Sequence, residues 1–389
     1  MLERDAVPAS DIKINELLRK DIQPDAENIL LTGGIGFLGI FLLNSLLKQT
    51  KAKIYCLIRP KKVLNIEERL HQNLVKYKFD KYIRSNRIVP VEGDLEQPRL
   101  GLSDAMYDVL ADRIDNIYHN GAVVNYVYSY NLLKNTNVTA TEEILRLAVT
   151  RRLKRVHYIS TLFVFSTTDY QGESVIYENY KPINGVDVNM GYGQSKWVAE
   201  KMVHCASERG IPVTIHRVGR ICGDTRHGIC QTKDLLWTIV KTCIQLQSRP
   251  ELDQMINISP VDYVSSAIVE ISSQRKSEGK TYHILNPKPI PMEDLYKMIE
   301  RLGYSVKKLT FEEWKKKALS YGEQYGDSSL AVLVHTLNRL RLEGRNRTFD
   351  MTNTMERLKG SSVCCPKISK GLLKKYFKYL TKIGFLSKK

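Results

Sequence analysis

This sequence lacks paired cysteines, internal repeats and low-complexity tracts. Its seven cysteines show no CxxC spacing and no histidine partners at the intervals of a metal site, so the sequence indicates no metal ion. The odd cysteine count and the absence of a secretory leader predict a reducing, cytoplasmic environment. What remains is an ordinary globular composition, with 43% hydrophobic and 26% charged residues among 389.

Acidic residues are scarce relative to basic ones. The chain has 59 Lys and Arg against 42 Asp and Glu, a formal net charge of +17. Such a surface attracts anions, which include nucleotide phosphates, nucleic acid, anionic lipid and acidic proteins, or it serves only to keep the protein soluble. No nucleic-acid motif accompanies the charge, so we expect no nucleic-acid partner.

Charge is missing altogether between Asn28 and Leu47. A stretch of about 20 uncharged residues has the length of a membrane span. Three glycines within four positions, followed by Gly39, instead favour a strand, a tight turn and a buried helix. We therefore expect no membrane segment.

Apolar runs of strand length alternate with helix-length segments, the pattern of parallel βαβ units. Runs such as IYCLI and VTIHRV are almost continuously apolar, which suits strands covered on both faces. The pattern predicts a doubly wound, Rossmann-type α/β sheet. The expected strands are 28–31, 53–58, 87–91, 116–118, 155–160, 212–217 and 281–285.

A glycine-rich turn follows the first expected strand. In TGGIGFLG the glycines stand between that strand and the helix FLGIFLLNSLL, where they allow a tight turn, close approach of a pyrophosphate, and helix–strand packing. The spacing departs from GxGxxG by one residue, and outside this context the turn alone would be weak evidence. We predict a dinucleotide site that includes Thr32, Gly33, Gly36, Phe37, Leu38 and Gly39.

Arg59 ends the second strand, twenty positions after Gly39, where an NAD enzyme carries an acidic residue for the ribose 2′-hydroxyl. A guanidinium there, with Lys61 and Lys62 beside it, suits a 2′-phosphate. The sequence therefore favours NADPH. A merely solvated basic turn would leave the cofactor preference open.

Two further strand ends belong to the expected site. In VEGDL, Asp94 can accept a hydrogen bond from the adenine amine, with Leu95 beside it. The small segment Asn120-Gly121-Ala122 lets the adenosine lie against the backbone.

Tyr192 and Lys196 in GYGQSKWVAEK stand four positions apart, so both lie on one face of a helix. A cation beside a phenol lowers the phenol's pKa towards the operating pH, which would make Tyr192 a general acid. Thr161, at the end of the strand RVHYIST, offers a hydroxyl to the same carbonyl oxygen. An isolated YxxxK is often only a solvated pair, but behind a glycine turn it indicates catalysis.

These motifs resemble the extended short-chain dehydrogenase/reductase family, and more closely the thioester reductase domains that terminate nonribosomal peptide synthetases and carboxylic acid reductases. The resemblance runs from LLTGGIGFLG through CLIRP, EGDLEQPRLGLS, YHNGAVVNY, YISTLFVF, GYGQSKWVAEK and SPVDYV to GFL. It implies a Thr161–Tyr192–Lys196 triad, with Arg69 as a second phosphate ligand. Val218 in HRVGR, a cofactor-site position, stands where the family usually has proline.

The resemblance implies NADPH-dependent reduction of a phosphopantetheine thioester, presented by a carrier protein, to an aldehyde. Whether a second reduction to the alcohol follows stays open. The expected partner is an acyl or peptidyl carrier protein, and the expected state is a monomer. Alternatives are a fatty acyl-CoA reductase, a sugar-nucleotide epimerase and a redox-silent NADP-binding sensor or scaffold.

We expect three parts along the chain. Residues 1–24 form a linker or helix, 25–285 the NADP-binding Rossmann domain with a helical lid at about 226–256, and 286–389 a smaller, mostly helical substrate-binding region. Trp237 and Leu246 either line an acyl channel or belong to the core. The basic C-terminal run ISKGLLKKYFKYLTKIGFLSKK either docks on a membrane or partner or packs its apolar stripe inward.

Overall fold

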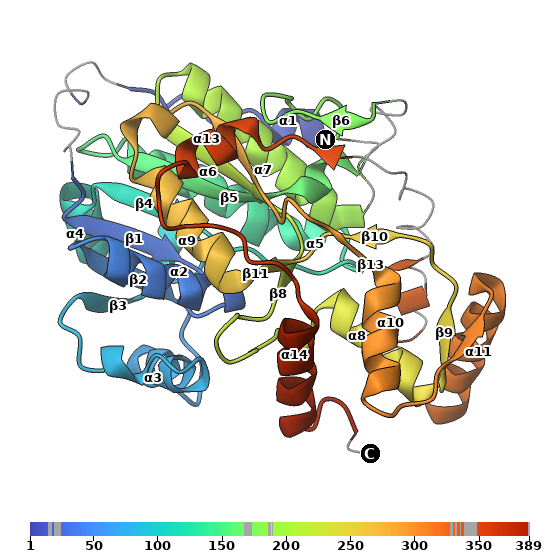
Figure 1. Ribbon diagram of the computed structural model, residues 1–389. Helices are drawn as coiled ribbons and strands as arrows, with labels where there is room; N and C mark the ends of the chain where they lie inside the picture. The colour runs from blue at the N-terminus through green and yellow to red at the C-terminus, as the bar shows by residue number, and fades with distance from the viewer. Residues whose placement is uncertain are drawn as a thin grey trace. The chain divides into compact units, whose positions relative to one another are not determined.

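The computed structural model describes residues 1–14, 18, 25–166, 173–185, 188, 190–326, 330, 333–334, 336–337 and 348–387. The chain divides into two units. The first unit comprises Met1–Val218, Val264–Ile284 and Thr348–Cys364, and the second comprises Gly219–Tyr263, Leu285–Arg347 and Cys365–Lys389. Figure 1 follows the chain through both.

Seven parallel strands form the sheet of the first unit, in the order β12-β7-β5-β4-β1-β2-β3. Every strand expected from the sequence is present, with ends that differ by one residue at most, and the predicted doubly wound sheet is confirmed. The strands are β1 (Asn28–Thr32), β2 (Lys53–Ile58), β3 (Ile88–Glu92), β4 (Asn116–His119), β5 (Arg155–Thr161), β7 (Val213–Val218) and β12 (Thr281–Ile284).

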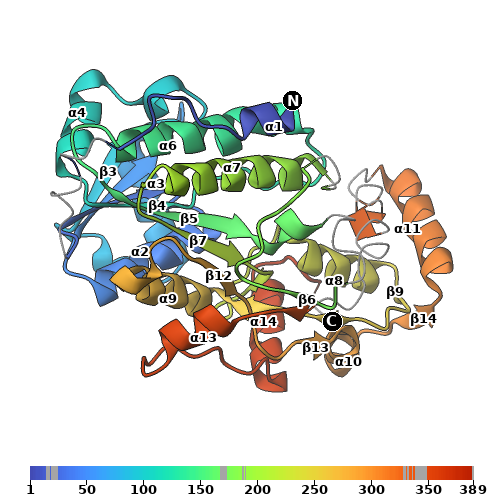
Figure 2. The ribbon, with the colours of Figure 1, turned by 90° about the horizontal axis from the view of Figure 1, so that it is seen from above.

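Helices cover both faces of this sheet, which explains its continuous apolar strands. Figure 2 shows α6 (Ala140–Ala148) and α7 (Met190–Glu208) on one face and α2 (Phe37–Gln49) and α9 (Val261–Ser272) on the other. The uncharged stretch from Asn28 thus becomes a strand and a 13-residue helix. Within the described ranges, no helix is long and apolar enough to cross a membrane.

Shorter helices complete the first unit. The α-helices are α1 (Leu2–Asp5), α3 (Ile66–Lys76), α4 (Asp104–Arg113), α5 (Tyr130–Lys134) and α13 (Thr352–Leu358). The 3-10 turns are η2 (Asp80–Tyr82), η3 (Pro98–Gly101), η5 (Leu162–Phe165) and η6 (Arg275–Ser277), and η4 (Asn135–Thr139) is a turn of π-helix.

A segment from the C-terminal third returns to the first unit. Strand β15 (Thr348–Phe349) pairs in parallel with β6 (Val175–Ile176). The buried Glu178 carboxylate accepts hydrogen bonds from the Thr354 hydroxyl at 2.6 Å and from the His283 amide at 2.8 Å. The region expected at 286–389 is therefore not continuous: residues 285–347 and 365–389 belong to the second unit, whereas residues 348–364 return to the first, where Glu178 binds the start of α13.

We expected a linker or helix at the start of the chain, and its described residues include the short helix α1. Ala6 and Ile12 are fully buried against the first unit. The helix expected around Lys13–Lys20 lies largely outside the described residues.

The second unit is mostly helical, as predicted, and adds short strand pairs that the sequence analysis did not anticipate. Its helices are α8 (Leu235–Gln245), α10 (Met292–Arg301), α11 (Phe311–Tyr325) and α14 (Lys370–Lys382). The strand pairs are β8 (Ile221–Cys222) with β11 (Ser259–Pro260), β9 (Ser248–Pro250) with β14 (Lys307–Leu309), and β10 (Met255–Ile256) with β13 (Ile290–Pro291).

The ambiguous apolar residues of the second unit belong to its core. Trp237 and Leu246, at the expected lid, are buried in one cluster with the inner face of α14. That face consists of Leu372, Leu373, Tyr376, Phe377 and Leu380, all buried, whereas Lys374 and Lys378 are exposed. The C-terminal run thus packs its apolar stripe inward.

Four buried histidines make the stability of the first unit depend on pH. Burial lowers the pKa of His119, His216 and His283 to about 3 each, and it lowers the pKa of His157 well below the ordinary 6.5. Below about pH 6.5 these histidines bind protons in the unfolded chain but not in the folded one. Their contribution to the free energy of unfolding is therefore fully present above that pH and is lost as the pH decreases towards 3.

We expect the free energy of unfolding to decline between pH 6.5 and 5. His157→Phe, which removes one buried imidazole, should flatten this decline by an amount that approaches about 1.4 kcal/mol per pH unit towards pH 5. Urea titrations at several pH values measure the slope. The exposed His71→Phe is the control and should leave it unchanged. Equal slopes in all three proteins would contradict the assignment.

Candidate active site

The predicted site residues gather at one edge of the sheet. Strands β1, β2, β3, β4, β5 and β7 run parallel, so the residues that follow them meet at the carboxyl edge. Strands β1 and β4 are neighbours, and from them the strand order runs outward in opposite directions. A ligand site is expected at such a switch point.

The glycine turn is built for close backbone approach. Gly33 has φ +66°, and a Cβ there would lie 2.8 Å from Gly121 Cα. A Cβ on Gly39 would lie 1.9 Å from Gly33 O, so any side chain would break the turn. Gly36 caps α2 without a side-chain hydrogen bond, and Phe37 and Leu38 form the first turn of that helix. Such a helix N-terminus favours an anion, as a pyrophosphate requires.

A directional hydrogen-bond chain holds this turn against the end of β4. The Gly121 amide donates to Thr32 Oγ1 at 2.9 Å, and that hydroxyl contacts His119 Nδ1 at 2.8 Å. His119 Nε2 lies 3.1 Å from Thr141 Oγ1, which itself donates to the Asn137 carbonyl. The hydroxyl proton of Thr141 is already engaged in the bond to the Asn137 carbonyl, so His119 donates to Thr141 through Nε2. The Nδ1 atom of His119 therefore accepts from the Thr32 hydroxyl.

Two guanidinium groups lie at the end of β2. Arg59 is exposed and pairs with Glu96 at 3.1 Å, and Arg69 of α3 donates to the Arg59 carbonyl. Burial first, and then the positive charge of Arg59, lowers the pKa of Arg69. Two neighbouring cations that repel each other form a place for a phosphate.

The adenine-side segments lie next to the glycine turn. Asp94 Oδ1 accepts from the Glu96 amide at 3.0 Å, and the Leu95 side chain would contact a Cβ on Gly121. Asn120 Nδ2 donates to Gly33 O at 3.3 Å, and Ala122 is half-buried beside Gly121. The structure therefore brings together the residues that we proposed for the dinucleotide.

The triad residues come from β5 and α7. Thr161 is the last residue of β5 and pairs in register with Val218 at the end of β7. Tyr192 is buried, and it lies close enough to Thr161 for the Thr161 hydroxyl to affect its pKa. Lys196, one turn further along α7, donates to the Ile159 carbonyl at 2.8 Å, and its ammonium lies 4.2 Å from the centre of the Tyr158 ring.

The local sequence explains the placement of Tyr192. A Cβ on Gly191 would lie 2.4 Å from the Tyr128 carbonyl oxygen, and one on Gly193 would lie 2.6 Å from Val188. The glycines on either side therefore let α7 begin in tight contact with the preceding segments.

The pKa of Tyr192 is shifted in the opposite direction to our expectation. Burial, and then the neighbouring Tyr126, raises it, and only the nearby Thr161 hydroxyl opposes the rise. Burial also lowers the pKa of Lys196 to about 7. Tyr192 thus holds its proton at neutral pH, as a hydrogen-bond donor or general acid must.

Several residues next to the site were not predicted from the sequence. Tyr126 and Phe163 surround Tyr192, with ring centroids 5.8 and 6.1 Å away. Asn137, in the π-helical turn η4, donates to Ser195 Oγ at 2.9 Å and accepts from the Val123 amide at 2.8 Å, so it ties the adenosine segment to α7. Such π-turns are frequent at functional sites, but the sequence contains no pattern that predicts this one.

Among the described residues, no group of three or more His, Cys, Asp or Glu is arranged to bind a metal ion. The strand order, the glycine turn at the switch point and the helix N-terminus define the class of NAD(P)-dependent oxidoreductases with a Rossmann fold.

Comparison with known proteins gives the family. The sequence profile of an NAD-binding family described as male sterility protein matches residues 31–268, and the chain belongs to this family. The terminal R domain from the myxalamid PKS-NRPS biosynthetic pathway is 38% identical, with a TM-score of 0.90 over 99% of this chain and 98% of that one. The chain is thus a reductase domain of the nonribosomal peptide synthetase type.

Two further relatives are longer than this chain. A linear gramicidin synthase from Brevibacillus parabrevis is 39% identical over 92% of this chain, which spans only 7% of that protein. A thiolation-reductase di-domain from an archaeal non-ribosomal peptide synthetase is 26% identical, with a TM-score of 0.78 over 97% of this chain and 81% of that one.

Gly39→Ala should abolish dinucleotide binding, because its Cβ would overlap Gly33 O. We expect NADPH affinity to fall at least about a hundredfold, on the scale of a core overpacking cost of 1–3 kcal/mol together with loss of the site geometry. Fluorescence titration with NADPH measures it. Gly371→Ala on the exposed side of α14 is the matched control. Unchanged affinity in Gly39→Ala would refute the site.

Proposed function

We propose that this domain uses NADPH to reduce a thioester, carried on the phosphopantetheine arm of a carrier protein, to an aldehyde. The observation that carries the proposal is the placement of Tyr192 and Lys196 of α7 against the end of β5, where Lys196 donates to the Ile159 carbonyl at 2.8 Å and Thr161 is the last strand residue. Membership of a family whose relatives include a thiolation-reductase di-domain supports the carrier as partner. The net charge of +17 suits both an acidic carrier and phosphorylated ligands.

The residues have separate tasks in this reaction. When bound, NADPH supplies the hydride that reduces the thioester carbonyl. Tyr192 and Thr161 donate hydrogen bonds to the oxygen that becomes negatively charged. Lys196, held at Ile159, positions the nicotinamide ribose. Collapse of the hemithioacetal then releases the thiol and the aldehyde.

NADPH rather than NADH is supported by Arg59 and Arg69. The Arg69 guanidinium donates to the Arg59 carbonyl at the end of β2, and the Arg59 charge acts on Arg69, at a place where an acidic side chain would be needed for an unphosphorylated ribose. In the structure, the Arg59 guanidinium forms an ion pair with the Glu96 carboxylate. A 2′-phosphate carries more charge than that carboxylate and would take over the guanidinium.

Tyr192→Phe should reduce the rate of aldehyde formation by about 10²–10⁴-fold, because it removes the proton donor and leaves the ring packing intact. NADPH oxidation with an acyl-loaded carrier, together with mass analysis of the product, measures the rate. Tyr325→Phe, at an exposed position on α11, is the control. A fully active Tyr192→Phe protein would overturn the triad, and reduction of acyl-CoA in preference to every loaded carrier would overturn the carrier assignment.

Arg59→Ser should raise the KM for NADPH by about 10–100-fold, which corresponds to one lost charged hydrogen bond of about 1.5–3 kcal/mol. The KM for NADH should stay the same, since NADH has no 2′-phosphate. Steady-state kinetics with both cofactors tests this, and Arg84→Ser, an exposed arginine of the same unit, serves as the comparison. Equal losses for both cofactors would argue against a phosphate contact.

A further inference from the structure

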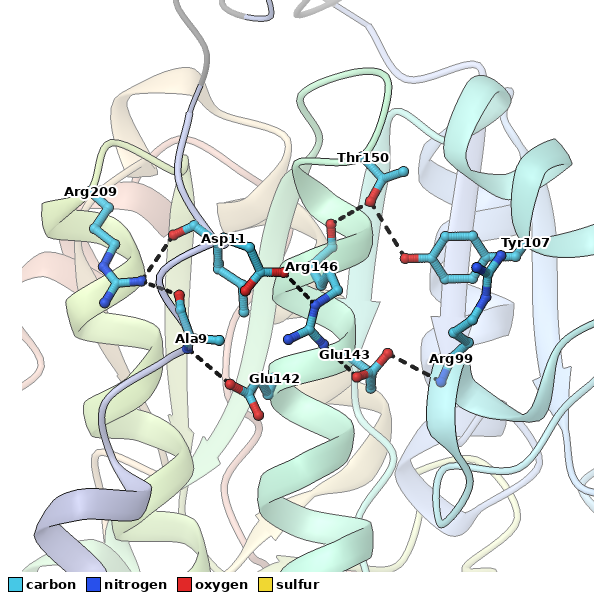
Figure 3. A network of polar contacts seen from close by, with 10 residues as sticks. Ala9, Asp11, Arg99, Tyr107, Glu142, Glu143, Arg146, Thr150 and Arg209 are labelled. Atoms are coloured by element: carbon cyan, nitrogen blue, oxygen red, sulfur yellow. Dashed lines mark hydrogen bonds and ion pairs between the residues drawn. The ribbon is translucent and has the colours of Figure 1, made fainter. Parts of the chain in front are cut away.

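The first residues of the chain lie along α6 and α7 (Figure 3). Arg209, directly after α7, donates hydrogen bonds to the carbonyl oxygens of Ala9 at 2.6 Å, Pro8 at 2.8 Å and Ile12 at 3.1 Å. The Ile12 side chain is fully buried. We call residues 8–12 the strap, because a single guanidinium fixes its backbone at three points.

Helix α6 holds the strap from the other side. The Ala9 amide donates to Glu142 Oε1 at 2.9 Å, and Asp11 Oδ2 accepts from Arg146 Nε at 2.8 Å. Arg146 also pairs with Glu143, whose side chain is only 14% exposed. The strap is therefore linked to Glu143 through one arginine.

Glu143 reaches in the opposite direction, to the turn η3. Its Oε2 accepts from the Arg99 amide at 3.1 Å (Figure 3). Arg99 and Leu100 have φ of +52° and +61°, and Gly101 follows with +65°. Two consecutive non-glycine residues in the left-handed region are energetically unfavourable, and such a conformation persists only where the surroundings hold it.

The strained turn in η3 supports the Asp94 segment of the cofactor site. The Asp94 amide donates to the Leu100 carbonyl at 2.7 Å, and Leu100 is fully buried. A Cβ on Gly101 would lie 2.8 Å from the Asp94 nitrogen, so the two segments are in close contact. A shift of the turn would therefore move Asp94 and its neighbour Leu95.

We propose that Glu143 is a positioning residue for the adenosine half of the cofactor, and that the strap holds Glu143 in place through Arg146. The inference rests on the proposed NADPH site. Exposed ion pairs by themselves contribute little, and Asp11 is 57% exposed. The strap contributes to cofactor binding because its contacts, through Arg146 and Glu143, end on the Arg99 backbone amide. That amide lies in a strained turn, where one hydrogen bond favours the observed backbone conformation over its alternatives.

Glu143→Ala is the principal test, with binding of NADPH and of adenosine 2′,5′-bisphosphate as readouts. We expect both dissociation constants to rise about three- to tenfold, the size of one hydrogen bond. The kcat at saturating NADPH should not change, because the triad is untouched. Asp11→Asn, which loosens only the strap, should raise both constants about twofold. Asp112→Asn removes an exposed ion pair with Arg151 and is the control.

The outcomes separate the proposals. If the folded Glu143→Ala protein binds both probes with the dissociation constants of the wild type, the positioning role is overturned. A lower kcat of this variant at unchanged affinity for NADPH overturns it as well. An effect of Glu143→Ala without any effect of Asp11→Asn overturns the role of the strap. Wild-type protein that binds neither probe contradicts the proposed NADPH site instead. If Glu143→Ala does not fold, Glu143→Gln, which keeps an acceptor for Arg99, should give an intermediate loss of affinity, and wild-type affinity in it overturns the proposal.

Discussion

The first unit depends on one fully buried ion pair, between Glu200 of α7 and Arg217 of β7. The two side chains have no exposed surface and lie 2.7 Å apart. Burial alone would raise the pKa of Glu200, but Arg217 and His204 outweigh that effect and keep the carboxylate ionised. A buried pair adds little net stability over apolar residues, whereas an unpaired charge in its place would be very costly. The pair therefore specifies where α7 must lie on the sheet.

This constraint reaches the site through neighbouring contacts. Glu200 also accepts from the Ser160 hydroxyl, next to Thr161 on β5. It lies one helical turn beyond Lys196 and two beyond Tyr192, so the helix that bears both residues is aligned with the strand that bears Thr161. Arg217 donates to the carbonyl of Glu178, whose carboxylate in turn holds α13. A single charged network thus joins α7 to the returning C-terminal segment.

Features that depend on local sequence patterns could be predicted from the sequence. The strands follow from apolar runs with turn signals between them, and the Gly33–Gly39 turn follows from the limited space around its backbone. The carboxyl-edge location of Arg59, Asp94 and Asn120 follows from parallel topology alone, because each comes within two residues of the end of a strand. Features formed by long-range pairing were missed: the return of Thr348–Cys364 depends on Glu178, and the docking of residues 8–12 depends on Arg209.

The sequence by itself determined the fold class, the switch-point location of the dinucleotide turn and the set of residues that could act on a carbonyl. Only the tertiary structure decided their protonation. From spacing, Lys196 was expected to lower the pKa of Tyr192, yet burial raises it, and the ammonium instead binds the Ile159 carbonyl. Sequence spacing shows which side chains share a helix face. The pKa depends on solvent exclusion and on nearby charges from other elements, which exist only once the chain is packed.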